Sequence, residues 1–164
     1  MGMDVYGKKP KTEVGAYFRN NVWYWHPLWE YCVHVLPDVA GKVENAHSND
    51  GDGLGFVDSR KLAFALRKSI DSGAAQKYID ERQEYIDNLP TQTCFCTGVS
   101  LFESYDFAGE IPFPKSETKA PKPECHQCKG TGQAPNFESS YFLTLDNISN
   151  FSQFLFDCGG FQIC

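Results

Sequence analysis

The segment from residue 17 to residue 29 reads YFRNNVWYWHPLW and holds all three tryptophans of the chain. Pro27 is suited to the first turn of a helix and disfavours helical geometry at His26, so we expect a helix that begins at Pro27 and ends near Pro37. Apolar residues at helical spacing give this helix one buried stripe. The stripe consists of Leu28, Trp29, Cys32, Val33 and Leu36.

The density of aromatic residues in this segment has two interpretations. The first is a buried core, which suits Trp25 and Trp29. The second is a partly exposed binding surface, because so many aromatic side chains are hard to bury in a chain of this size. Aromatics interleaved with arginine are also typical of protein-binding hot spots and of platforms that stack a nucleobase. On the second interpretation the binding residues are Tyr17, Arg19, Trp23 and Tyr24.

Composition limits the class of protein. The chain has 164 residues, of which 41% are hydrophobic and 22% charged, as expected for one globular domain. Its net charge of -6 has the wrong sign for sequence-independent contact with phosphate backbones, so we expect no bulk nucleic-acid binding. No apolar run approaches the roughly 20 residues that span a bilayer, and the first residues lack the regions of an export signal. We therefore expect a cytoplasmic protein without membrane contact.

Capping and turn residues predict three further helices. Asp58 is expected to cap the second helix, which ends at Gly73. The third helix covers residues 74–88. Asp146 is expected to cap the last helix, and the glycine pair at 159–160 to close it.

Outside the helices we expect an extended arm at residues 1–15, a loop at 41–57 and short strands at 99–107 and 141–145. The fold class is therefore mostly α, within the α+β class: a small helical domain with a few short strands. We expect the whole chain, 1–164, to form a single domain with residues 94–132 as a zinc-knuckle insert.

The seven cysteines favour metal binding over a disulfide framework, because their number is odd and the chain shows no export signal. Four of them form two knuckles, Cys94-Phe95-Cys96 and Cys125-His126-Gln127-Cys128, with 28 residues between the knuckles. Zinc prefers four soft thiolate or imidazole ligands in a tetrahedron, which two such turns supply. The alternative is a set of free or redox-sensitive thiols.

The predicted ligands are Cys94, Cys96, Cys125 and Cys128. The first knuckle is narrow, with one residue between its cysteines where two are normal. His126 can either replace one thiolate or point to solvent. Four thiolates would close the coordination shell, so the zinc would be structural rather than catalytic.

Other candidate sites are weaker. The loop around Asp50 and Asp52 resembles a calcium loop, but Ser59 stands where the bidentate glutamate is required, so whether these carboxylates bind a second metal stays open. His26, His34 and His47 belong to no catalytic motif. Cys32 and Cys158 are expected in the core.

Two resemblances add to these inferences. The chain resembles a group of small uncharacterised bacterial and phage proteins with an aromatic opening and a knuckle pair. The resemblance rests on the opening MGMDVYG, the segment 17–25, the Pro27-Leu28-Trp29 step, the Asn49-Asp50-Gly51 turn and the closing Gly159-Gly160-Phe161. The second knuckle, with the pattern CxxCxGxG, is similar to the repeats in the cysteine-rich zinc domain of Hsp40-type chaperones, which has four where this chain has two. The first resemblance implies a bacterial or phage, cytoplasmic setting, and the second implies zinc and protein contacts.

These observations predict a non-catalytic, zinc-stabilised interaction protein with a protein partner, in a phage setting an inhibitor or adaptor acting on a host protein. One alternative is a small-ligand protein that binds or sequesters nucleotides on the aromatic segment, with Arg19 and the lysines at 8–11 offsetting phosphate charge. Another is a metal-dependent hydrolase that uses His47 and Asp50. Because no catalytic set is assembled in the sequence, we expect a binding protein rather than an enzyme.

Overall fold

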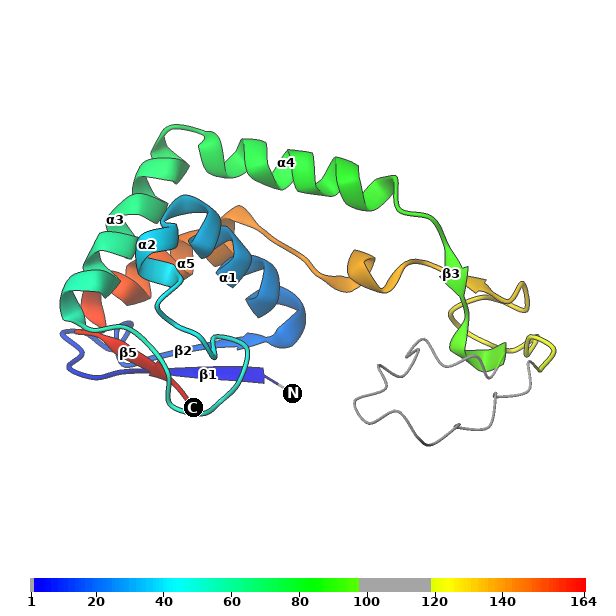
Figure 1. The fold of residues 1–164 in the computed structure, drawn as a ribbon, viewed down its shortest axis with the longest axis horizontal. Helices are drawn as coiled ribbons and strands as arrows, with labels where there is room; N and C mark the ends of the chain where they lie inside the picture. The colour runs from blue at the N-terminus through cyan, green and yellow to red at the C-terminus, as the bar shows by residue number, and fades with distance from the viewer. Residues whose placement is uncertain (1, 98–118) are drawn as a thin grey trace, which may run out of the picture. The chain divides into compact units, whose positions relative to one another are not determined.

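The computed structural model describes residues 2–97 and 119–164. The protein is mostly helical and of the α+β class, as predicted. It divides into two compact units, the first comprising 1–87 and 140–164 and the second 88–139 (Figure 1). The first unit contains β1 (Gly2–Gly7), β2 (Tyr17–Asn21), α1 (Val22–Val35), α2 (Pro37–Ala40), α3 (Phe56–Asp71), α4 (Ala74–Asp87), α5 (Leu145–Asp157) and β5 (Phe161–Ile163). The second contains β3 (Gln92–Thr93), the 3-10 turn η1 (Phe95–Thr97) and β4 (Gln133–Ala134), and the 3-10 turn η2 (Phe137–Ser140) reaches its end.

The first helix begins five residues earlier than predicted. The Asn21 side chain accepts a hydrogen bond from the Tyr24 N–H at 3.2 Å and caps α1, which places Pro27 inside the helix. Proline has no N–H to donate to the carbonyl of Trp23 one turn earlier. The N–H of Phe142 donates to that carbonyl instead, at 2.9 Å. The prediction that the helix begins at Pro27 is therefore wrong, because a distant segment replaces the bond that proline removes.

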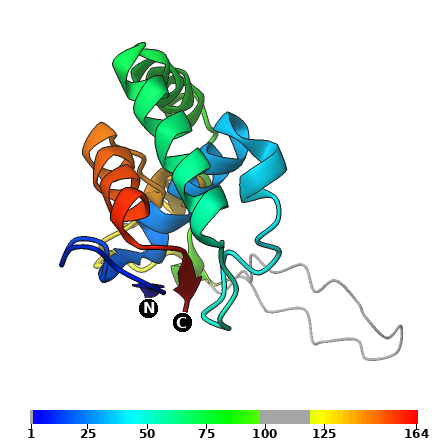
Figure 2. The ribbon, with the colours of Figure 1, turned by 90° about the vertical axis from the view of Figure 1, so that its left-hand side faces the viewer.

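The expected extended arm at 1–15 is in part a strand at the centre of a sheet. The strand order is β2-β1-β5, and both neighbours pair antiparallel with β1. Met3 and Val5 alternate with more exposed residues along β1 and are buried. The helices of this unit lie on the face of the sheet that these two residues cover (Figures 1 and 2). The prediction missed the strand because one of its two partners, β5, lies at the other end of the described chain.

Two other caps differ from the prediction. Gly55, not Asp58, precedes α3, and Asp58 lies in the first turn, where its carboxylate is 2.6 Å from Lys42 Nζ. Thr144, not Asp146, caps α5 by accepting a hydrogen bond from the Asn147 N–H at 3.2 Å. Both predicted caps are acidic residues at the second or third position of their helix, where negative charge is also favourable.

The short strands were predicted poorly. Residues 141–144 form no strand, because the Phe142 N–H bonds to α1 rather than to a sheet. The strand expected at 99–107 lies outside the described residues. The helix α4 agrees closely with the expected range of 74–88.

The core of the first unit lies between α1, α3, α5 and the sheet. Helices α3 and α5 lie side by side (Figures 1 and 2), and the Ser152 hydroxyl donates to the Ala63 carbonyl between them at 3.1 Å. Trp25 is fully buried, and its Nε1–H donates to the Ala46 carbonyl at 2.7 Å. The core interpretation of the aromatic segment therefore holds for Trp25 and its stacked neighbour Trp29. Cys32 and Cys158 are buried in the same core, as expected.

The predicted loop before α3 covers the outer edge of β5. The Gly51 N–H donates to the Ile163 carbonyl at 2.7 Å, and the Phe161 N–H donates to the Leu54 carbonyl at 2.9 Å. This close approach leaves no space for a side chain at Gly53, whose Cβ would overlap the Phe161 carbonyl. The loop thus closes one edge of the sheet.

Gly53→Ala should destabilise the protein by about 1–3 kcal/mol, because the added methyl group forces the loop away from β5. Gly55→Ala is the matched control: a Cβ there meets no atom within 4 Å, and its backbone has φ -78°. We expect it to lower the free energy of unfolding by less than about 1 kcal/mol, because alanine is a poorer N-cap than glycine but meets no clash there. Urea unfolding followed by tryptophan fluorescence measures the free energy of unfolding of both variants. Equal effects of Gly53→Ala and Gly55→Ala would contradict the close approach of the loop to β5.

Candidate metal centre

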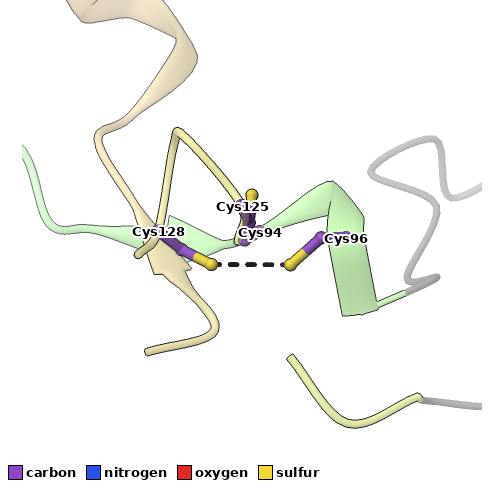
Figure 3. Close-up of side chains that lie close together, drawn as sticks. All are labelled: Cys94, Cys96, Cys125 and Cys128. Carbon is purple, nitrogen blue, oxygen red and sulfur yellow. Dashed lines mark hydrogen bonds between the residues drawn. The ribbon is translucent and has the colours of Figure 1, made fainter. Parts of the chain in front are cut away.

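The four knuckle cysteines come together in the second unit. The sulfur atoms of Cys94, Cys96, Cys125 and Cys128 all lie within 4.8 Å of one another (Figure 3). Among the described residues, this is the one group of three or more His, Cys, Asp or Glu side chains arranged so that they can hold a metal ion. The four predicted ligands therefore form a site that can hold a metal ion.

The spacing of the sulfurs fits a tetrahedral thiolate site. A zinc–sulfur bond of about 2.3 Å gives a sulfur–sulfur edge of about 3.8 Å in a regular tetrahedron. The Sγ atoms of Cys94 and Cys125 are 3.7 Å apart, and those of Cys96 and Cys128 are 3.5 Å apart. Both pairs join one cysteine of each knuckle, so a central ion would clamp the two turns to each other.

The first knuckle brings both cysteines to the site despite its narrow spacing. Strand β3 leads into Cys94, and η1 then turns the chain within three residues. The backbone N–H and the hydroxyl of Thr97 both donate to the Cys94 carbonyl, at 3.0 and 2.7 Å. This tight turn brings the Cys96 sulfur to within 3.5 Å of the Cys128 sulfur (Figure 3), so one intervening residue is sufficient.

The second knuckle folds back through residues with left-handed backbone. The Lys129 N–H donates to the Cys125 carbonyl at 2.8 Å, and the Thr131 N–H to the Cys128 carbonyl at 2.9 Å. Gly130 has φ 85° and Lys129 has φ 49°, a conformation that glycine adopts at little cost and other residues rarely adopt. The glycines of the CxxCxGxG pattern therefore have a backbone role.

A short ladder joins the two knuckles. Strands β3 and β4 pair antiparallel, with Thr93 opposite Gln133. The Cys94 N–H then donates to the Gly132 carbonyl at 2.8 Å. These bonds hold Thr93 and Cys94, at the first knuckle, beside the segment 132–133, which follows the second knuckle.

Backbone N–H groups surround the sulfurs of the second knuckle. Burial alone would raise the pKa of Cys128, but N–H donors from Gly132 and Gly130 and the neighbouring thiols lower it to about 6. The N–H groups of Cys128 and Gln127 donate to the Cys125 sulfur and lower its pKa as well. Such donors stabilise a thiolate, which is the form of cysteine that binds metal.

The two cysteines of the first knuckle have higher pKa values than those of the second and are therefore less readily ionised. The Lys122 N–H favours the Cys96 thiolate, but burial and hydrogen bonds with the other thiols raise the pKa of Cys96 to about 12. The Cys96 N–H likewise favours the Cys94 thiolate, but burial and hydrogen bonds with the thiols of Cys125 and Cys128 leave the pKa of Cys94 raised. Each of the four sulfurs thus receives at least one backbone N–H. Without a cation, the raised pKa values of Cys94 and Cys96 would keep these two thiols protonated at neutral pH.

His126 is exposed and is not part of the group of four. Of its two predicted roles, the solvent-facing one agrees with the structure. Cys164 is also exposed, in the first unit, and is outside the group.

The four predicted binding residues are spread over one region of the first unit. The Tyr17 hydroxyl donates to the Asp4 carboxylate, and Arg19 Nε lies 3.5 Å from the same carboxylate. Trp23 and Tyr24 pack against the rings of Tyr141 and Phe142. Arg19 and Tyr24 line a surface hollow of about 660 Å³, whereas Tyr17 and Trp23 do not.

Sequence reasoning missed other residues that line this hollow. Thr144, Asn147 and Asn150 come from α5 and the residue that caps it, more than a hundred positions after Arg19. Asparagines near the start of a helix carry no signal of their own, so only the fold reveals that they lie close to Arg19.

The residues considered for a hydrolase do not assemble into a metal site in the described part of the chain. The rings of His26 and His47 lie 4.2 Å apart, and burial lowers the pKa of both. The Asp50 carboxylate accepts a hydrogen bond from Ser48, and Asp52 accepts from the backbone N–H groups of Asn45 and Gly53. These two carboxylates therefore stabilise turns.

Comparison of the chain with protein-family models, curated proteins and solved structures finds no match. The two resemblances described above therefore stay predictions that rest on their motifs. Within residues 2–97 and 119–164, none of the helices is both apolar and long enough to span a bilayer.

Cys128→Ser should abolish metal retention, because three ligands cannot hold the ion against competition from buffer and chelator. Cys164→Ser is the matched control, since this cysteine lies outside the group. The measurement is metal content per chain by atomic emission after gel filtration with a mild chelator. Equal metal content in the two variants would exclude Cys128 as a ligand.

Proposed function

We propose that Cys94, Cys96, Cys125 and Cys128 hold one structural zinc ion. The observation that carries this proposal is the group of four sulfurs with two cross-knuckle separations close to a tetrahedral edge. Four thiolates in a tetrahedron are typical of structural zinc, and they leave no coordination position for water or substrate. The ion would therefore shape the protein rather than perform chemistry.

The composition of the second unit supports a structural role for the ion. Its buried cluster in the described residues consists of Cys94, Cys128 and Ala134, with Cys96 and Cys125 packed against them. So small an apolar cluster offsets little of the conformational entropy lost on folding. A structural zinc ion contributes on the order of 10 kcal/mol to the folding of such segments. The metal would thus replace a hydrophobic core.

We infer that the protein acts by binding another protein, and that the zinc knuckles display part of the contact surface. Phe95 lies between two of the proposed ligands and is 49% exposed. A large aromatic residue on a rigid turn is typical of binding hot spots. In a phage setting, such a protein would be an inhibitor or adaptor of a host protein. A cytoplasmic location agrees with this proposal, because reducing conditions keep thiolates available for zinc.

Metal analysis and cobalt substitution test the zinc proposal. We expect one zinc per chain as purified. Replacement by Co²⁺ should give the strong visible absorption of a tetrahedral thiolate site, unchanged by added azide because the shell is closed. An azide-dependent spectrum would indicate an open position and overturn the structural role, and an absence of any tetrahedral spectrum would overturn the site itself.

Phe95→Ala tests the interaction proposal while leaving all four ligands in place. We expect the variant to retain its metal and to bind the partner at least ~30-fold more weakly, as for a hot-spot residue. The partner is identified by cross-linking in the source cell and its affinity is measured by calorimetry. Phe64→Ala is the matched control, because Phe64 is a similarly exposed phenylalanine on α3 of the other unit. If Phe95→Ala binds the partner as the unaltered protein does, the knuckles do not form the contact surface.

A further inference from the structure

The surface hollow of the first unit lies where β2 ends and where α1 and α5 begin. All its lining residues belong to this unit, so it is separate from the metal centre. Its volume of about 660 Å³ is within the range of small-molecule sites, about 300–1,000 Å³. The hollow is therefore large enough for a specific ligand.

The lining is polar and rich in side-chain amides. Four asparagines line the hollow, Asn20, Asn21, Asn147 and Asn150. A carboxamide offers two N–H donors and a carbonyl acceptor on one rigid plane. A ligand that satisfies such a lining must itself carry donors and acceptors close together, as neighbouring hydroxyl groups do.

Hydrogen bonds hold this lining in place before any ligand binds. Asn20 Nδ2 donates to Asn147 Oδ1 at 2.8 Å, and Asn147 Nδ2 donates to the Tyr24 carbonyl at 3.2 Å. Asn21 caps α1 through its side-chain oxygen. The end of the strand and the starts of both helices are thereby fixed together, which lowers the entropy lost on binding.

Some of this hydrogen-bonding capacity is not used inside the protein. Within the described residues, the exposed side chain of Asn150 has no hydrogen-bond partner, and the bonds given above leave Asn20 Oδ1 and Asn21 Nδ2 without one. These groups come from two elements, the end of β2 and the first turns of α5, on the lining of the same hollow. They can converge on one ligand without breaking any internal bond.

The charges of the hollow favour an uncharged ligand. Arg19 lies beside Asp4, at 3.5 Å, so its charge is already partly balanced. Asp146 adds a negative charge to the lining. The lysines predicted to offset phosphate lie elsewhere: Lys11 Nζ is over the ring of Phe56, at 5.8 Å from its centre. A phosphate group would therefore meet no excess of positive charge.

Aromatic rings stand in and beside the hollow. Tyr24 lines it and packs against Phe142, with ring centres 5.7 Å apart. On the outer face of the sheet, next to Arg19, the rings of Tyr6 and Tyr17 are 5.0 Å apart, and both residues are exposed. The flat faces of such rings suit ligands whose own rings have an apolar C–H face.

We propose that this hollow binds a neutral carbohydrate, a mono- or oligosaccharide whose hydroxyl groups bond to the asparagine amides and whose ring packs on tyrosine. The combination of paired donors and acceptors, balanced charge and the Tyr24 ring in the lining fits a sugar. It does not fit a nucleotide, which needs net positive charge. This site goes beyond the zinc-dependent protein contact and does not depend on it.

The test begins with a glycan array and with amide-detected NMR of the full chain. The NMR probes are glucose, galactose, N-acetylglucosamine, maltose and ATP, each titrated to millimolar concentration, together with any glycan that the array retains. We expect at least one sugar to shift the side-chain amide signals of Asn20, Asn147 and Asn150. The proposal is overturned if no sugar shifts these signals, or if ATP shifts them and the sugars do not.

Two single variants then locate the site. Asn150→Ala should weaken binding of the active sugar about five-fold, as expected for the loss of one hydrogen bond. Gln153→Ala is the matched control, because Gln153 is also an exposed amide on α5 but does not line the hollow. It should leave the Kd unchanged. Equal affinities for the two variants, at equal melting temperatures, would place the sugar elsewhere and overturn the proposal.

Discussion

Four sulfur atoms confined within 4.8 Å cannot all be ionised unless a cation lies between them, because like charges at this distance strongly oppose one another. The second unit depends on this constraint. Its turns, its two-residue strands and its backbone N–H donors all serve to bring the sulfurs together, and almost nothing apolar is buried with them. The described part of this unit is thus arranged so that one cation can balance the negative charge of four thiolates.

The first unit is held together differently, by a hydrophobic core and by backbone bonds between distant segments. The bond from the Phe142 N–H to the Trp23 carbonyl is the clearest example, because it satisfies an acceptor that Pro27 leaves open within α1. It also fixes the chain just before α5. The hollow between α1, β2 and α5 depends on that position. The bond that compensates for Pro27 in α1 therefore also helps to form the candidate binding site.

The sequence alone predicts the features whose signals are local. Two cysteine pairs at short spacing predict the metal site because few other roles require that pattern, and strongly periodic segments predict α3 and α4. It does not predict β1, whose partner Gln162 lies opposite Tyr6 but at the other end of the chain. Nor does it predict the start of α1, because the effect of Pro27 is offset by a residue more than a hundred positions away. The asparagines of the hollow are missed for the same reason.

The first unit is discontinuous in sequence, and this has a consequence for its synthesis. The central strand β1 is made before the other described elements, but its neighbour β5, residues 161–163, is made after them. The knuckles, at residues 94–128, are complete well before α5 is made. Because domains fold as their segments emerge, at about 5–20 residues per second, the cysteines can capture their ion while β1 still lacks one neighbour. In a nascent chain, the metal site in the middle of the sequence would thus form before the sheet of the first unit is complete.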